Sequence, residues 1–233
     1  IAEAAYCMRE KTLMAGASGF IVPLFSQWED AEEYGGEDAC EKRKGTCILY
    51  VIGTNNPTTM RQVEYLSGQE GVVSVRVRAC ACMQGDEEGE IRRCVREAEE
   101  VMKQKPEALL LAIDTQEMFS ETAMDGEKSA LEHTKKIADC CAEIAKEIIG
   151  KRFFNSMVVS GGDTAQLVLE KLHIDSMRIV AEFAPGISVA VVENGCDKMT
   201  VVTKSGGFGD DQTLYSLKPY LRKVGKSIHV VAG

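Results

Sequence analysis

Residues 156–172 read SMVVSGGDTAQLVLEKL, and this stretch decides the fold class. A short apolar run ends at Gly161-Gly162, and a helical pattern of apolar residues follows it directly. A strand that passes through a glycine turn into a helix is the repeating unit of sheets with parallel strands. The stretch therefore predicts an α/β fold.

The same alternation of short apolar runs and longer amphipathic runs continues along the chain. We predict further strands over 46–53, 72–79, 107–114, 176–186, 187–195 and 199–210, and helices over 55–68, 88–104, 126–149 and 211–223. Cys80 and Cys82 are expected to continue the strand-like alternation of 72–79. The pattern predicts a three-layer, Rossmann-like fold in which helices flank a mostly parallel β-sheet.

Three segments are expected along the chain. Residues 1–30 read as a helical lead-in from a preceding domain, because Ile1 lies in a helical pattern that is already under way. Residues 31–45 are charged, contain glycine and lack periodicity, which is typical of a surface connection. Residues 46–233 hold the main α/β domain.

Composition excludes several classes of function. The formal net charge of −9 argues against non-specific binding to nucleic acid or to an anionic membrane. The apolar runs are far shorter than the ~20 residues of a membrane span, and no secretory signal is visible. Nine scattered cysteines fit reduced thiols in a cytoplasmic protein, and they lack the pairing with each other or with histidine that a metal site needs. No metal site is predicted.

The turn at Gly161-Gly162-Asp163-Thr164 suits a phosphate group. Two glycines let a ligand approach the backbone, and a helix N-terminus offers free N–H groups with a partial positive charge. Thr164 could add a hydroxyl donor, and Asp163 could hold Mg²⁺ through its water shell. The alternative is that Asp163 or Thr164 is only the helix N-cap, and both interpretations stay open.

A second glycine turn follows the last predicted strand at Lys204, Ser205, Gly206, Gly207 and Gly209. Successive N–H groups of such a loop can surround a phosphate, although the order of a Walker loop is absent. A plain strand-to-helix connection is the alternative. Lys204 either contributes positive charge or keeps its head group in water.

A third turn at Gly53-Thr54 precedes a helix for which Asn56 is a good N-cap and Pro57 a good first residue. Thr58 and Thr59 lie in the same helix start. All three turns follow strands, and ligands of open α/β sheets bind at the carboxyl ends of strands. Capping explains each turn separately but not their coincidence, so we expect the turns to share one phosphate-bearing ligand.

Four motifs in order carry a resemblance to a known family. They are Gly53-Thr54 with Thr59 and Gln62, Gly161-Gly162-Asp163-Thr164, Ala184-Pro185-Gly186, and Lys204-Ser205-Gly206-Gly207-Phe208-Gly209. With them the chain resembles the C-terminal, nucleotide-binding domain of the four-carbon acid sugar kinases, which phosphorylate threonate, erythronate or 3-oxo-tetronate with ATP. The resemblance runs from Gly16 to Asp210, since Gly16-Ala17-Ser18-Gly19 is similar to the family's Gly-Ser-Ala-Gly segment.

The chain departs from the family pattern at two positions. Thr54 replaces a serine and keeps its hydroxyl, whereas Gly207 replaces an asparagine and loses a side-chain amide. The family's Asp-Asp-x-Thr-Gly-Ala motif, which belongs to the sugar-acid site, does not occur in these 233 residues. The catalytic residues are therefore expected in a preceding domain, without which the chain is expected to be inactive.

The resemblance implies that residues 46–233 bind ATP or ADP with Mg²⁺, and it leaves a homodimer open. The implied nucleotide contacts are Gly53, Thr54, Asn56, Thr59, Gly161, Gly162, Asp163, Thr164, Ser205, Gly206, Gly207, Phe208 and Gly209. A small sugar acid would bind through the other domain. The alternative function is a module that senses a nucleotide or phosphorylated metabolite without catalysis. A dinucleotide-dependent oxidoreductase is disfavoured, because no G-x-G-x-x-G follows a strand.

Overall fold

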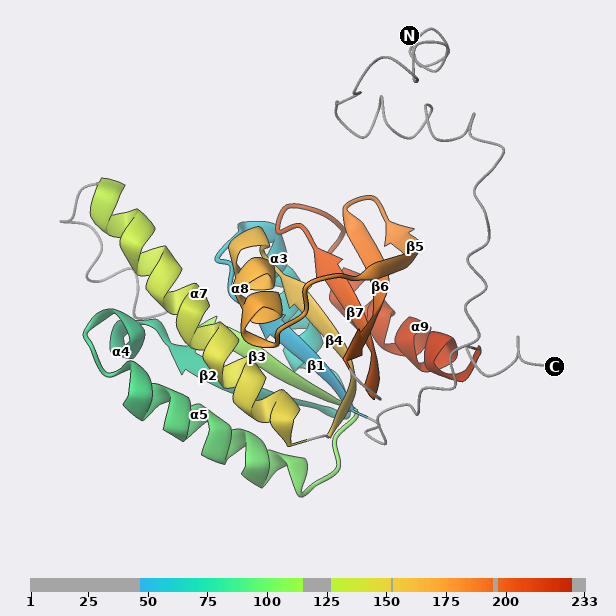
Figure 1. The fold of residues 1–233 in the computed structure, drawn as a ribbon, viewed down its shortest axis with the longest axis horizontal. Coiled ribbons are helices and arrows are strands. Elements are labelled where there is room, and N and C mark those ends of the chain that lie inside the picture. Colours follow the sequence, from blue (N-terminus) through green and yellow to red (C-terminus); the bar gives the residue numbers. More distant parts are fainter. Residues whose placement is uncertain (1–46, 115–126, 152, 195–196, 228–233) are drawn as a thin grey trace, which may run out of the picture. The chain divides into compact units, whose positions relative to one another are not determined.

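A single sheet of seven strands organises the residues described by the computed structural model, which are 47–114, 127–151, 153–194 and 197–227 (Figure 1). The strands are β1 Cys47–Ile52, β2 Val72–Arg78, β3 Ala108–Asp114, β4 Phe154–Ser160, β5 Arg178–Ala184, β6 Ile187–Asn194 and β7 Asp197–Lys204. The helices are α3 Pro57–Ser67, α4 Ala79–Met83, α5 Glu87–Met102, α7 Glu127–Gly150, α8 Gly162–Lys171 and α9 Thr213–Ser227. Most predicted elements are present within a few residues of their expected ends.

The strand order is β2-β3-β1-β4-β7-β6-β5. The neighbours from β2 to β7 are parallel, whereas β6 runs antiparallel to both β7 and β5. Because parallel strands need long crossovers, helices must cover both faces of the sheet. The predicted mostly parallel α/β fold is confirmed.

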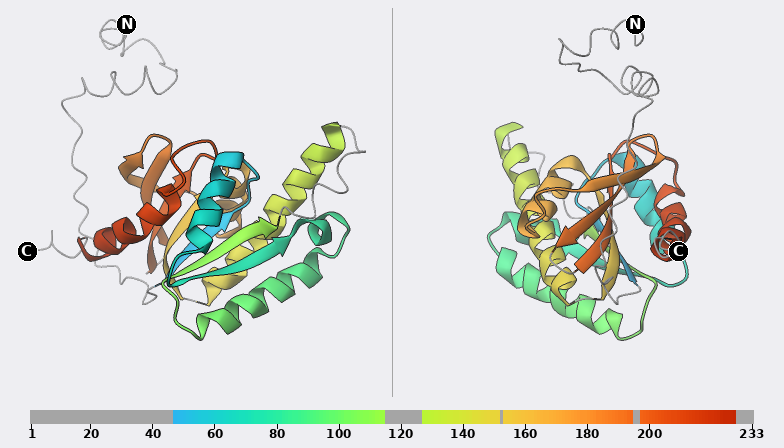
Figure 2. Two further views of the ribbon diagram at one scale, coloured as in Figure 1. Left: turned by 180° about the vertical axis from the view of Figure 1, so that it is seen from behind. Right: turned by 45° about the vertical axis from the view of Figure 1, so that its right-hand side comes forward.

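Alternating residues of β1 supply both halves of the core. Leu49 and Val51 pack toward α5, α7 and α8 on one face, while Ile48 and Tyr50 pack toward α3 and α9 on the other. Figure 2 shows α3 and α9 together in front of the sheet when the molecule is seen from behind. Every residue of β1 is buried, as expected for a central strand with helices on both sides.

The chain changes faces between two neighbouring strands. After β1 it enters α3 on one face, and after β4 it enters α8 on the opposite face. Connections that leave adjacent strands in opposite directions open a crevice at the carboxyl ends of those strands. The turns at Gly53 and Gly161 lie at that crevice.

Some predictions differ from the structure or lie outside it. The predicted continuation of the strand through Cys80 and Cys82 is wrong: β2 ends at Arg78 and both cysteines lie in the short helix α4. Among the described cysteines, Cys47, Cys82, Cys94, Cys140 and Cys141 are buried and are not joined in disulfides. The segments 1–30 and 31–45, with Gly16–Gly19, lie outside the described residues.

Two features do not occur among the described residues. Over the ranges given above, no helix is long and apolar enough to cross a membrane. In the same part of the chain, no group of three or more histidine, cysteine or acidic side chains is arranged to hold a metal ion.

A buried carboxylate fixes the start of α5 to the end of β2. Glu90 is fully buried and accepts hydrogen bonds from the Arg78 backbone N–H at 2.8 Å, from Arg78 Nη2 at 2.6 Å and from Arg93 Nη2 at 2.6 Å. Burial by itself raises the pKa of Glu90, but the hydrogen bonds from Arg93 and Arg78 outweigh it and lower the pKa to about 2. The carboxylate is thus ionised in the fold at any ordinary pH.

We predict that Glu90→Gln lowers the free energy of unfolding by about 3 kcal/mol at pH 7. A carboxyl group whose pKa is lower in the folded than in the unfolded protein stabilises the fold at pH values above its unfolded pKa. That contribution is lost as pH falls from about 4.5 toward about 2, so the difference between the variant and the parent should shrink over that window. Urea denaturation of the variant and the parent at several pH values measures this difference in the free energy of unfolding. Glu100→Gln, which removes an exposed ion pair with Lys103 on the same helix, should change stability by less than about 0.5 kcal/mol.

Candidate functional site

The three predicted turns meet at the carboxyl ends of β1, β4 and β7. The Gly161 N–H donates to the Lys204 carbonyl at 3.2 Å. A Cβ on Gly161 would lie 3.3 Å from Thr54 Cβ, and one on Gly206 would lie 3.2 Å from Asn56 Cβ. The expectation that these turns lie side by side is confirmed.

Gly53 gives room for Thr164. A Cβ on Gly53 would stand 2.1 Å from Thr164 Oγ1, which is far inside van der Waals contact. The Thr164 side chain is buried in this space, so the two turns pack directly against each other. A glycine at this strand end therefore sets the distance between β1 and α8.

The N-terminus of α8 has no side-chain cap. Its N-cap is Gly161, whose φ of 109° and ψ of 129° suit only glycine, and no side-chain cap hydrogen bond is formed. The alternative in which Asp163 or Thr164 serves as the N-cap is therefore wrong. The N–H groups at the start of α8 are not satisfied by a capping side chain, and Gly162 and Asp163 are exposed beside them. This end of the helix carries the partial positive charge that attracts anions.

Local hydrogen bonds shape the turn after β1 as predicted. Asn56 is the N-cap of α3, its Oδ1 accepts from the Thr58 N–H at 3.0 Å, and Pro57 is the first helical residue. Thr54 Oγ1 accepts from the Asn56 N–H at 3.2 Å. Thr54 and Asn56 are half-buried, and they face the loop that holds Gly206.

Two buried side chains of α3 hold the loop after β7. Thr59 Oγ1 donates to the Gly206 carbonyl at 2.6 Å. Gln62 Nε2 donates to the carbonyls of Phe208 at 3.0 Å and Asp210 at 2.8 Å. Both side chains are completely buried, so Thr59 has no exposed surface with which to touch a ligand. Thr59 fixes the position of Gly206.

Lys204 lies beneath the same loop. Its side chain is 2% exposed, which makes the interpretation that its head group sits in water wrong. Its Nζ donates to the Ser205 carbonyl at 2.9 Å and to Thr59 Oγ1 at 3.3 Å. Burial lowers the pKa of Lys204 to about 8. The lysine thus brings a positive charge under the loop rather than to its surface.

The remaining motif, Ala184-Pro185-Gly186, supports the loop from the side. The Ser205 N–H donates to the Gly186 carbonyl at 3.0 Å. Gly186 has a φ of 74°, and a Cβ there would lie 2.7 Å from the Phe208 ring. Phe208 rests on this glycine with 45% of its surface exposed. All four motifs therefore lie together at the end of the sheet where β1, β4 and β7 finish.

A cleft of about 120 Å³ opens between the turns and α7. It is lined by Gly53–Asn55, Gly161–Thr164, Ile113, Thr134, Ile137 and Ala138. Ser205–Gly209 lie outside this lining. The sequence analysis missed the contributions of β3 and α7, because a helical apolar stripe does not reveal which of its residues border a cleft.

Comparison with known proteins identifies the family of the chain. Residues 49–214 match the family described as the nucleotide-binding C-terminal domain. The chain belongs to this family, which forms the C-terminal domain of the four-carbon acid sugar kinases, and the resemblance seen in the sequence is confirmed.

Two relatives are kinases. The chain is 26% identical over 232 residues to D-threonate kinase of Salmonella typhimurium, covering 96% of this chain and 52% of the relative. It is 22% identical over 209 residues to 3-oxo-tetronate kinase of Pectobacterium atrosepticum, covering 88% and 47%. The chain thus spans about half the length of the relatives it matches.

Solved structures share the fold. A protein of Salmonella typhimurium LT2 superposes with a TM-score of 0.66 at 20% identity, over 90% of this chain and 48% of that one. A Bordetella bronchiseptica protein described as a domain of unknown function, DUF1537, was crystallised with bound citrate as a domain-swapped dimer. It gives a TM-score of 0.58 at 20% identity, over 94% and 49%.

We predict that Gly161→Ala lowers the free energy of unfolding by about 1–3 kcal/mol, because the backbone conformation at this N-cap is strained for any residue with a Cβ. Gly162→Ala is the matched control, since nothing lies within 4 Å of a Cβ at that position and its φ is not positive. The control should leave stability unchanged or raise it by up to about 1 kcal/mol. Equal effects in urea denaturation would contradict the role given to Gly161.

Proposed function

We propose that this chain binds ATP as the nucleotide-binding domain of a kinase that phosphorylates a four-carbon sugar acid of the threonate, erythronate or 3-oxo-tetronate type. The observation that carries the proposal is the uncapped N-terminus of α8, which lies between two glycine turns in the crevice of β1 and β4. A helix start without a capping side chain in this position is suited to a phosphate.

The phosphates would be held mainly by backbone groups. N–H groups of Gly162 and Asp163 would meet one phosphate, and those of Gly206 and Gly207 would meet the next. Thr54 would add a hydroxyl beside them. Phosphoryl transfer depends mostly on positioning and on the offset of negative charge, so a site made of amides with a nearby ammonium suits it.

Other members of the predicted contact set would act indirectly or at the rim. Thr59 and Lys204 would position the loop after β7 from below, and the Lys204 charge would attract the phosphates through the loop. Asn56, Ser205, Phe208 and Gly209 would border the ligand.

Asp163 is the carboxylate that fits Mg²⁺. It is exposed in the first turn of α8 and lines the cleft. Mg²⁺ in nucleotide sites keeps several waters and takes one or two carboxylates together with phosphate oxygens, which a single carboxylate at this place satisfies. When bound, the ion would offset phosphate charge.

The sugar acid and the catalytic residues would be held outside these residues. The chain covers 52% of the D-threonate kinase relative, and the groups proposed above to hold the nucleotide are mainly backbone donors. We therefore expect nucleotide binding without turnover from this chain alone, in a cytoplasmic setting.

We predict that calorimetry detects binding of ATP with Mg²⁺, and that affinity falls at least about threefold between pH 7.5 and 9.5. Burial lowers the pKa of Lys204 to about 8, so its charge is lost as pH rises through that value, whereas ATP phosphates stay ionised throughout. Lys204→Met should bind more weakly and lose this pH dependence.

Lys103→Met, at the exposed C-cap position that follows α5, is the control for the loss of one positive charge. It should keep both the affinity and the pH dependence of the parent. Absence of binding at millimolar ATP would refute the proposed function.

We further predict that Gly207→Asn, which restores the residue of the family pattern, tightens ATP binding by about three- to tenfold through one added hydrogen bond. The position has room, because a Cβ on Gly207 would meet only Asn56 Nδ2 at 3.9 Å. Gly207→Ala supplies the Cβ without the amide and should give no gain. Titration of both variants checks this, and an equal gain from alanine would show that the amide is not the cause.

A further inference from the structure

The cleft has two chemically different sides. One side carries the polar turns at Thr54 and the start of α8. The other side carries Ile113 at the end of β3 with Ile137 and Ala138 of α7, and Thr134 stands one helical turn above them. Positions 134, 137 and 138 share one face of α7, so a single helix face forms this side.

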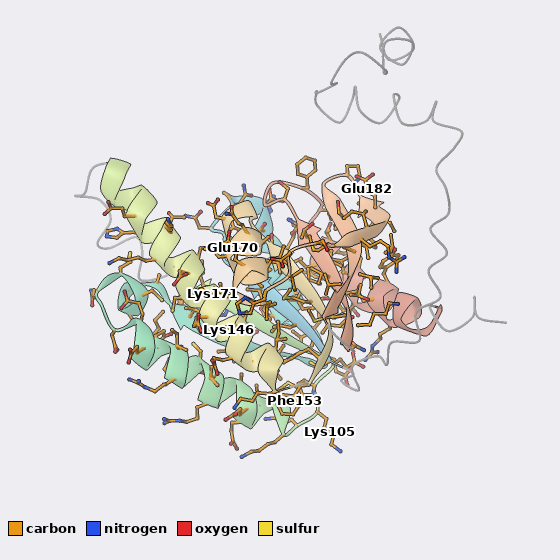
Figure 3. The ribbon with its side chains drawn as sticks, in the orientation of Figure 1. Lys105, Lys146, Phe153, Glu170, Lys171 and Glu182 are labelled. Atoms are coloured by element: carbon orange, nitrogen blue, oxygen red, sulfur yellow. The ribbon has the colours of Figure 1, made fainter. Side chains whose placement is uncertain are left out.

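Ion pairs connect α7 with α8. Lys171 near the end of α8 pairs with Asp139 of α7 at 2.9 Å and with Glu143 at 3.0 Å. Lys146 reaches the same Glu143 at 2.8 Å, and Figure 3 labels both lysines where the two helices meet. These ion pairs link α7 to the C-terminal end of α8.

α7 also continues beyond the strands. It has 24 residues, which corresponds to a length of about 36 Å, whereas the strands have six to eight residues. Figures 1 and 2 both show its first turns projecting past the carboxyl ends of the sheet. Thr134, which is exposed, lies on this side of the cleft mouth.

The cleft is too small for a whole nucleotide. Its volume of about 120 Å³ is well below the ~300–1,000 Å³ of sites that enclose drug-sized ligands. The loop of Ser205–Gly209, with Lys204 beneath it, lies outside the cleft on the far side of the α8 N-terminus. A ligand that uses both places must have a compact, partly apolar end and a long anionic end.

We infer that the cleft takes the base of the nucleotide, which lies against Ile113 and the α7 face, while the phosphates run across the start of α8 toward Ser205–Gly209. This inference rests on the proposed function and gives the ligand a direction. It makes α7 the element that senses the nucleoside part. The opposite direction would place the base on the exposed ring of Phe208.

Thr134→Phe tests the direction, because a bulky ring at the cleft mouth should exclude the base and leave the phosphates alone. We expect ATP to bind at least tenfold more weakly and tripolyphosphate, each with Mg²⁺, to bind as in the parent. Lys135→Phe is the matched control: it adds the same ring at the next exposed position of α7, outside the cleft lining, and should change neither affinity.

Phe208→Ala completes the test. If ATP affinity falls tenfold in this variant and is unchanged in Thr134→Phe, the base lies on Phe208 and the inference is overturned. A second measurement needs no variant: the parent should bind ADP at least tenfold more tightly than pyrophosphate, and equal affinities would also overturn it. Failure of the parent to bind either ATP or tripolyphosphate would refute the proposed function itself.

Discussion

The hydrogen bonds from Thr59 and Gln62 to the loop after β7 are the constraint on which the candidate site depends. Both side chains leave α3 completely buried and end on backbone carbonyls of Gly206, Phe208 and Asp210. These contacts fix the carbonyls of the loop on its inner side. A buried donor that lost its partner would cost about 1–3 kcal/mol, so the loop has one favoured arrangement.

The sheet explains why this loop meets the other two. β4 lies between β1 and β7, so the turns that follow these three strands are neighbours whatever their distance in sequence. The change of faces between α3 and α8 then keeps helices from covering the ends of the strands. Backbone amides gather at the site because of topology, and the side chains around them mainly hold those amides in place.

Local signals predicted most of the fold. Strand and helix periods are properties of short windows, and glycines at strand ends marked the turns, including Gly161 with its positive φ. α4 was missed because a helix of five residues has too few positions to show a period. The sequence could not predict the strand order, the burial of Lys204 or the α7 side of the cleft, because each depends on which distant segments pack together.

The place of β7 inside the sheet has a consequence for how the chain is made. β5 and β6 leave the ribosome before β7, yet they join the sheet only through β7, which lies between them and β4. The hairpin they form therefore stays unattached to the sheet until β7, which follows β6 closely in the sequence, has emerged. Because β7 must pair with β4 across the 36 residues between them, a nascent chain halted before β7 would expose the flank of β4 to chaperones and to other strands.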